Sequence, residues 1–169
     1  MTRIIDWLRA NVHGFNHLSN EEVSAISDFS LLWALFESRL LNTEGSVRSI
    51  CDIVDGWKKD GTLDATSFDP ELGYFRQRYF ANGAFADNFG HLYLRKNDQE
   101  QLVRAVIDGS CDDPRDRVAA ILIIIFRYRN NLFHGVKWQY KIAGQLGNFT
   151  TANAVLIKVL DRHGGLLEG

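Results

Sequence analysis

Arg129, Asn130 and His134 form the part of the chain best suited to catalysis. They lie in the segment RYRNNLFHGVKW, which follows the apolar run VAAILIIIF without a break. In an ideal helix Asn130 and His134 share one face, and the long side chain of Arg129 reaches round to them. His134 falls in the expected last turn, where the negative end of the helix dipole favours a protonated imidazole. Because histidine exchanges protons near neutral pH, these residues can form a proton-transfer site.

An ordinary helix end explains the same residues. Arginine and histidine are common in the last turn of helices because they suit the dipole, and Gly135 can take the left-handed conformation that ends a helix. Spacing alone favours this structural interpretation over a catalytic one. The choice depends on the elements that position the segment.

Composition limits the chain to one globular domain. It has 169 residues, of which 46% are hydrophobic, and only 2 Pro. With 19 basic and 21 acidic residues the net charge is −2, so any binding to nucleic acid or to an anionic membrane must be local. Cys51 and Cys111 lie outside any CxxC spacing, which argues against a disulfide framework or a structural zinc site and predicts reduced, buried thiols.

The N-terminal segment MTRIIDWLRANVHG carries charges inside its apolar pattern, so we expect no secretory signal. The longest apolar run, residues 118–126, is less than half the length of a membrane span. We therefore expect a soluble, cytoplasmic protein that does not engage a membrane.

Helical patterns account for most of the chain. Ser19 and Glu22 form a capping box, Gly61 is a stop signal, and Asp69 and Asn97 are suitable N-caps. The predicted helices cover residues 19–41, 46–61, 69–82, 97–109, 113–134 and 148–163.

The segment from Asp113, which contains the candidate site, also resembles a buried strand because AAILIIIF is rich in β-branched residues. Asp113 and Pro114 form an N-cap and first-turn pair, and no turn signal follows before Gly135. We therefore predict one helix of about twenty residues, central to the core. The whole chain, 1–169, is predicted to be a single all-α bundle, with a peripheral N-terminal helix in 1–18 and a core bundle in 19–163.

RNNLFH resembles the RNxxxH motif of the HEPN superfamily, small all-α domains whose motif ends a late apolar helix. Arg129, Asn130 and His134 match its Arg, polar residue and His. LLWALFES is similar to an earlier HEPN helix that carries an acidic residue facing the motif, and Glu37 takes that place. The resemblance covers roughly residues 20–163.

This resemblance implies a metal-independent endoribonuclease without a cofactor, acting as a homodimer whose two motifs meet at a twofold interface. Such cleavage needs a proton taken from the 2′-hydroxyl, a proton given to the 5′-oxygen, and stabilisation of the phosphorane. His134 suits proton transfer and Arg129 suits the phosphate. Asn130 would orient His134 or donate to a phosphate oxygen. Two imidazoles across a dimer axis can perform both proton transfers.

Two readings stay open for Glu37, which lies among apolar residues at helical spacing. A buried carboxylate without a partner is costly, so Glu37 either pairs with Arg129 and orients it or lies at the edge of the apolar stripe in water.

RNA also requires a binding surface. Arg76 and Arg78 alternate with aromatic residues in YFRQRYF, a mixture that can contact phosphate and stack on bases, or else represents a core with solvated arginines. Arg127, Lys137 and Lys141 flank the motif and are better candidates for phosphate contacts by proximity.

His13 and His17 have the spacing of a metal pair, but Gly14 weakens the intervening helix and no further ligands cluster nearby. We therefore expect these histidines at the surface and no metal site.

The leading hypothesis is a HEPN ribonuclease, a toxin or phage-defence effector with an RNA substrate and a cognate antitoxin or inhibitor. The alternative is a non-catalytic HEPN-like module that binds a nucleotide or a partner protein. The intact motif favours the first, whereas the weak overall charge favours the second.

Overall fold

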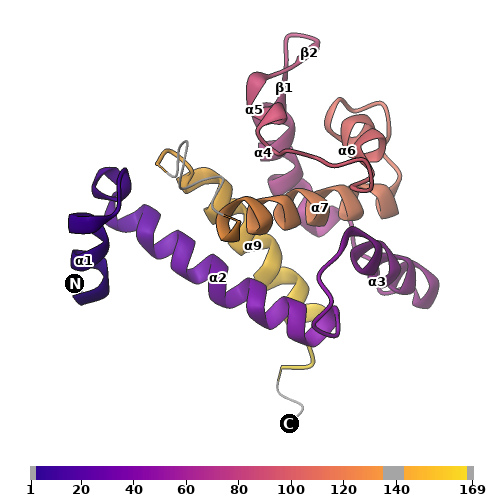
Figure 1. Cartoon of the computed structure of the whole chain (residues 1–169). Coiled ribbons are helices and arrows are strands. Elements are labelled where there is room, and N and C mark those ends of the chain that lie inside the picture. The colour runs from indigo at the N-terminus through magenta and orange to yellow at the C-terminus, as the bar shows by residue number, and fades with distance from the viewer. Residues whose placement is uncertain (1–2, 135–142, 167–169) are drawn as a thin grey trace.

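The computed structural model describes residues 3–134 and 143–166, and the fold is mostly helical (Figure 1). The helices are α1 Arg3–Asn11, α2 Asn20–Leu40, α3 Val47–Asp60, α4 Asp69–Tyr79, α5 Asp87–Gly90, α6 Glu100–Ile107, α7 Pro114–Phe133 and α9 Leu146–His163. Two short 3₁₀ turns, Phe15–His17 and Thr66–Phe68, precede α2 and α4. A small antiparallel hairpin pairs β1 Phe80–Ala81 with β2 Ala84–Phe85. The predicted all-α class is confirmed.

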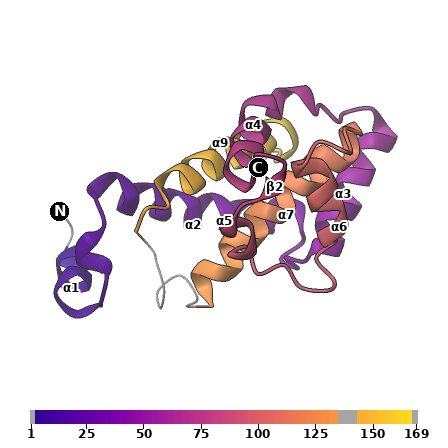
Figure 2. The same ribbon diagram turned by 90° about the horizontal axis from the view of Figure 1, so that it is seen from above.

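Helix α7 runs through the middle of the core, and all of its side chains from 118 to 126 are buried. Helices α3 and α6 pack against α7, while α2 and α9 pack along each other. Figures 1 and 2 both place α1 at the opposite end of the molecule from α3 and α6. None of the helices within the described residues is long and apolar enough to cross a membrane.

The strongest local signals give the expected helix starts. Ser19 and Glu22 form the predicted capping box at α2, with both hydrogen bonds present at 3.0 and 3.1 Å. Asp113 accepts hydrogen bonds from the first two backbone N–H groups of its helix, which confirms a helix rather than a strand for the segment that follows. Gly61 ends α3 with a φ of 77°.

The prediction that Asp69 caps α4 is wrong. Asp69 lies inside the helix, and its carboxylate pairs with Arg117 of α7 instead. The helix also ends at Tyr79 rather than near Asn82, because Asn82 and Gly83 take left-handed conformations that turn the chain into the hairpin.

Asn97 does not cap α6, which begins at Glu100 after Gln99, a residue in the left-handed region. The neighbouring Asp98 instead binds the backbone N–H of Arg95 at 2.8 Å. The carboxylate therefore closes the preceding loop on itself, and that loop borders the candidate site.

Both cysteines are free but only partly buried, which corrects the prediction of buried thiols. Burial raises the pKa of Cys51, and the nearby Arg115 partly opposes that shift. Residues 3–18 contain the helix α1 and a separate turn, whose residue Phe15 is buried.

Candidate functional site

Arg129 of α7 lies beside Glu37 of α2. The Arg129 Nη2 atom is 3.6 Å from Glu37 Oε1, and the two side chains are 27% and 21% exposed. This distance makes an ion pair without a short hydrogen bond. The structure therefore contains the pairing expected for Glu37, rather than a carboxylate alone in water.

Two further contacts hold the Arg129 guanidinium. Its Nη1 atom donates to Asn130 Oδ1 at 3.0 Å, and its Cζ lies 5.5 Å from the centroid of the Phe133 ring. The Nε atom is buried and has no hydrogen-bond partner among the described residues. A buried guanidinium donor without a partner is unfavourable, so this side chain has unused hydrogen-bonding capacity.

Gly45 confines the Glu37 carboxylate from the other side. A β-carbon at position 45 would collide with Glu37 Oε1 and would lie 3.6 Å from the Trp33 ring. The absence of a side chain lets the loop after α2 pass close to the carboxylate. Glu37 is therefore held between this loop and Arg129.

His134 is the C-cap of α7, and its backbone N–H donates to the Asn130 carbonyl at 2.9 Å. Its exposed side chain opens on a cleft of about 550 Å³. The cleft is lined by Tyr93, Leu94, Arg95, Arg127, Asn130, Asn131 and His134. Asn130 and His134 thus share the cleft, whereas Arg129 does not line it and connects to it through the Asn130 amide.

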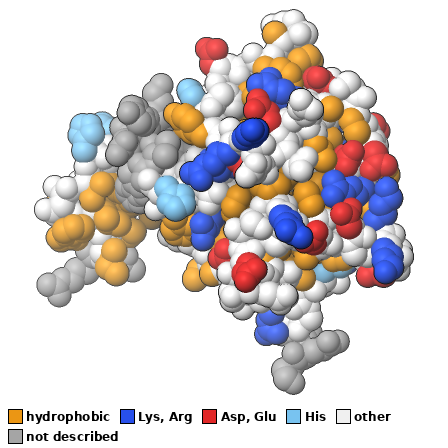
Figure 3. Space-filling model, turned by 45° about the vertical axis from the view of Figure 1, so that its right-hand side comes forward, with side chains coloured by type: hydrophobic (Ala, Val, Ile, Leu, Met, Phe, Trp, Pro, Cys, Tyr) orange, Lys and Arg blue, Asp and Glu red, His pale blue; other side chains and the backbone are white. Residues whose placement is uncertain are grey.

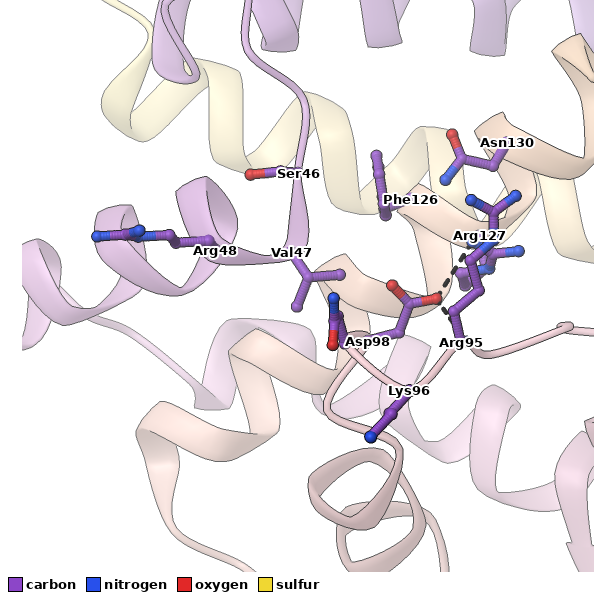
Figure 4. Close-up of a pocket in the computed structure, with 10 residues that line it drawn as sticks. Ser46, Val47, Arg48, Arg95, Lys96, Asp98, Phe126, Arg127 and Asn130 are labelled. Atoms are coloured by element: carbon purple, nitrogen blue, oxygen red, sulfur yellow. Dashed lines mark hydrogen bonds and ion pairs between the residues drawn. The ribbon is translucent and has the colours of Figure 1, made fainter.

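A second cleft of about 570 Å³ adjoins the first (Figure 4). Its lining residues are Ser46, Val47, Arg48, Arg95, Lys96, Asn97, Asp98, Phe126, Arg127 and Asn130. The two clefts share three residues, Arg95, Arg127 and Asn130, and we call their combined surface the motif groove. Figure 3 shows Lys and Arg side chains across the middle of one face of the molecule, with Asp and Glu side chains among them.

Arg127 is a structural residue, which corrects its expected contact with RNA. Its side chain is 3% exposed, its Nη1 atom is 3.2 Å from Asp98 Oδ2, and its Nε atom donates to the Leu92 carbonyl at 3.0 Å. Burial lowers the pKa of Arg127 while Asp98 opposes that shift, and a guanidinium so paired stays charged. Its charge holds the loop rather than a phosphate.

The segment YFRQRYF belongs mainly to the core, as the alternative reading expected. Phe75 and Tyr79 are 0% and 1% exposed, so neither ring can stack on a base. Arg76 donates from Nε to the Val106 carbonyl at 3.0 Å and thereby joins α4 to α6. Arg78 is half-buried against Tyr79, its Cζ 5.9 Å from the ring centroid. Neither arginine lines the motif groove.

Lys137, Lys141 and Gly135 lie outside the described residues. His13 and His17 are exposed. Within residues 3–134 and 143–166, no three His, Cys, Asp or Glu side chains are grouped closely enough to hold a metal ion.

Sequence reasoning missed the residues of the loop between α5 and α6. Tyr93, Arg95 and Lys96 are exposed and line the groove, as does Arg48 from α3. The aromatic and basic run YLRK was the available local signal. Its place beside the motif depends on contacts with α7, which no local pattern reveals.

Comparison with protein-family models, curated proteins and solved structures finds no match to this chain. The HEPN resemblance therefore stays a prediction that rests on the motif and on Glu37.

Proposed function

We propose that this chain is a metal-independent endoribonuclease of the HEPN type. The observation that carries the proposal is the convergence of Asn130 and the exposed His134 on a cationic groove, with Arg129 bound to Asn130 and paired with Glu37. An ordinary helix end does not require the Arg129–Glu37 pair, which joins α7 to α2.

The residues divide the chemistry among them. Among the three motif residues, His134 is the exposed one. Its imidazole can therefore take the proton of the 2′-hydroxyl or give a proton to the leaving 5′-oxygen. Attack by the 2′-oxygen on phosphorus breaks the bond to the 5′-oxygen, so the products carry a 2′,3′-cyclic phosphate and a 5′-hydroxyl. Arg129 stabilises charge on the phosphorane, while Glu37 and Asn130 orient the guanidinium. No activated water is needed, because the substrate supplies the nucleophile.

Two proton transfers call for two imidazoles, and we propose that a homodimer supplies them from two copies of His134. Phe133, which precedes His134, is 54% exposed and gives the motif an apolar neighbour suited to a subunit contact. His91 is a competing second imidazole in the same chain, because its ring centroid lies 6.4 Å from that of Tyr93, which lines the cleft with His134.

Cleavage of total RNA and of a tRNA pool, with and without excess EDTA, tests the activity. The wild-type chain should generate 5′-hydroxyl ends in EDTA, should leave DNA intact, and should lose activity in His134→Ala. His17→Ala, an exposed histidine outside the groove, is the matched control and should cut normally. Ends with 5′-phosphate, or inhibition by EDTA, would refute the mechanism. RNA binding without new ends would favour the non-catalytic alternative.

Mixed dimers distinguish the two sources of the second imidazole. A dimer of one wild-type and one His134→Ala chain should be strongly impaired, and His91→Ala should remain active. Light scattering that shows an active monomer, together with loss of activity in His91→Ala, would assign both imidazoles to one chain. Growth arrest on expression of the wild-type chain, and not of His134→Ala, tests the proposed role as a toxin or defence effector that a cognate antitoxin restrains.

A further inference from the structure

Tyr93 presents an exposed aromatic ring in the cleft that holds His134. The residue is 48% exposed, and its ring centroid lies 6.4 Å from that of His91 at an angle of 27°. Its backbone has a φ of 52°, a left-handed conformation that residues other than glycine rarely adopt and that persists only where the surroundings impose it. Aromatic faces beside cations are the usual platform for bases of single-stranded nucleic acid.

Two side chains of α7 impose this conformation on the loop. Arg127 Nε and Asn131 Nδ2 both donate to the carbonyl of Leu92, the residue before Tyr93, at 3.0 and 3.3 Å. Leu92 itself is 1% exposed. The Tyr93 ring is therefore presented from a backbone that is fixed to the same helix as the motif.

Arg95 extends the surface beyond the ring. Its backbone N–H is bound by Asp98, and its exposed side chain lies beside Arg127 in both clefts (Figure 4). Lys96 lines the second cleft, while the side chain of Arg48, at the other end of that cleft, points away from the other lining residues and pairs with Asp52 at 4.0 Å. Asp98 is the only acidic residue among the described residues that line the groove, and its carboxylate is paired with Arg127. The groove is thus locally positive in a chain with a net charge of −2.

We propose that Tyr93 and Arg95 form a subsite for one unpaired nucleotide of the RNA, next to the phosphodiester that His134 addresses. The base stacks on the Tyr93 ring and the adjoining phosphate binds Arg95. This inference rests on the proposed ribonuclease function and adds a substrate requirement to it. A base in a duplex is stacked on its neighbours and cannot reach the ring, so the nucleotide at this position must be unpaired.

Binding of a fluorescein-labelled, unstructured RNA by fluorescence anisotropy tests the subsite. The measurement uses the full chain with His134→Ala, so that cleavage does not consume the probe. Tyr93→Gly is the informative variant, because glycine accepts the left-handed backbone and removes only the ring. It should weaken binding by about 5- to 150-fold, whereas Tyr93→Phe should bind normally. Trp7→Ala, which removes an exposed aromatic from α1, is the matched control and should change nothing.

Two further comparisons define the ligand. Annealing the probe to its complement should weaken binding to the parent chain, and one abasic nucleotide should reproduce the loss caused by Tyr93→Gly without adding to it. Arg95→Ala should lower both affinity and the salt dependence of binding by about one phosphate contact, and Lys59→Ala should not.

The outcomes separate this inference from the proposed function. If the wild-type chain cuts RNA but Tyr93→Gly binds and cuts normally, or if duplex RNA binds equally well, the subsite is refuted and the ribonuclease stands. If the chain neither binds nor cuts any RNA, both are refuted.

Discussion

Two of the arginine–carboxylate pairs on helix α7, those of Arg127 and Arg129, lie two residues apart and differ in almost every physical respect. The Arg127–Asp98 pair is 3.2 Å long, with side chains only 3% and 9% exposed. The Arg129–Glu37 pair is 3.6 Å long and its side chains are 27% and 21% exposed. The Nε atom of Arg127 is used by a backbone carbonyl, whereas that of Arg129 has no partner among the described residues.

The contrast teaches how to separate a structural arginine from one suited to function. Arg127 is buried, has partners for its Nε and Nη1 atoms, and joins two segments far apart in sequence, so its charge stabilises the fold. Arg129 is partly exposed and its pair with Glu37 is longer, so a phosphate can reach its guanidinium even though the unpaired Nε atom is buried. Proximity to the motif suggested RNA contacts for both. Burial and hydrogen bonding distinguish them.

Removal of Arg127 should give the largest change in stability. Arg127→Ala leaves the Asp98 carboxylate buried without a partner, which costs about 3–5 kcal/mol in free energy of unfolding. Urea denaturation measures this change in the free energy of unfolding. The double variant Arg127→Met with Asp98→Leu should recover much of this loss, because no charge is left buried. A loss below about 1 kcal/mol in Arg127→Ala would show that the pair contributes little.

Removal of Arg129 should have the opposite balance of effects, with a large loss of activity and a small loss of stability. Arg129→Ala should lower the rate of RNA cleavage by about 10²–10³-fold, the usual effect of losing a donor to a transition-state anion. Its free energy of unfolding should change by less than about 1 kcal/mol, because the pair is partly exposed and 3.6 Å long. Arg129→Lys should restore little activity, since an ammonium cannot hold Asn130 and a phosphate in the guanidinium geometry. Equal activities of Arg129→Ala and the wild-type chain would remove Arg129 from the site.

Much of this contrast lies beyond sequence reasoning. Local rules predicted α7 correctly, because Asp113 and the following proline fix its start, and they placed the three motif residues on it. Asn82–Gly83 is a readable hairpin signal in the sequence, and it outweighs the helical pattern there. By contrast, Arg127 and Leu92 are 35 residues apart in the chain, and nothing local indicates that they meet.

The dependence on contacts that local patterns do not reveal also explains why two predicted N-caps, Asp69 and Asn97, are wrong. Asp69 has a suitable N-cap side chain, but a long-range ion pair with Arg117 uses its carboxylate. Asn97 was favoured as a cap, yet the loop closes through Asp98 and turns at Gln99. At Asp69 a tertiary contact outweighs the local preference, and at Asn97 the neighbouring Asp98 does so by closing the loop and pairing with Arg127 of α7. The groove, which consists of such contacts, was the least predictable part of the molecule.

Weakening the Arg129–Glu37 pair should lower the cleavage rate less than removing Arg129 does. Glu37→Gln keeps the side-chain volume but removes the charge that orients Arg129, and a partly exposed ion pair contributes up to about 1 kcal/mol, equivalent to about 5-fold in rate. Unfolding should remain cooperative. Unchanged turnover would assign Glu37 to the structure alone.

Gly45→Ala tests the same pair without altering either partner. The added methyl group collides with the Glu37 carboxylate, which is the end of a flexible side chain and can shift away from Arg129. Activity should therefore fall in the same direction as in Glu37→Gln, and the double variant should lose no more than Glu37→Gln alone. Additive losses would show that Gly45 acts through something other than Glu37.

The smallest expected effect is a dependence of the free energy of unfolding on pH, which His163 contributes. It bears on the pH at which variants of the Arg127 and Arg129 pairs can be compared. His163 stacks on Trp57 with ring centroids 4.0 Å apart, and burial, followed by Arg162, lowers its pKa below the ordinary value of 6.5, while Asp60 acts in the opposite direction. The folded protein therefore binds this proton less readily than the unfolded chain. Stability from His163 is fully present above about pH 6.5 and is lost as the pH falls through the lowered pKa of the folded state. Unfolding free energies at pH 5.5 and 7.5 should differ less in His163→Gln than in the wild-type chain. An unchanged difference would assign the pH dependence to other groups, and the Arg127 and Arg129 variants should then be compared at several pH values rather than above pH 7 alone.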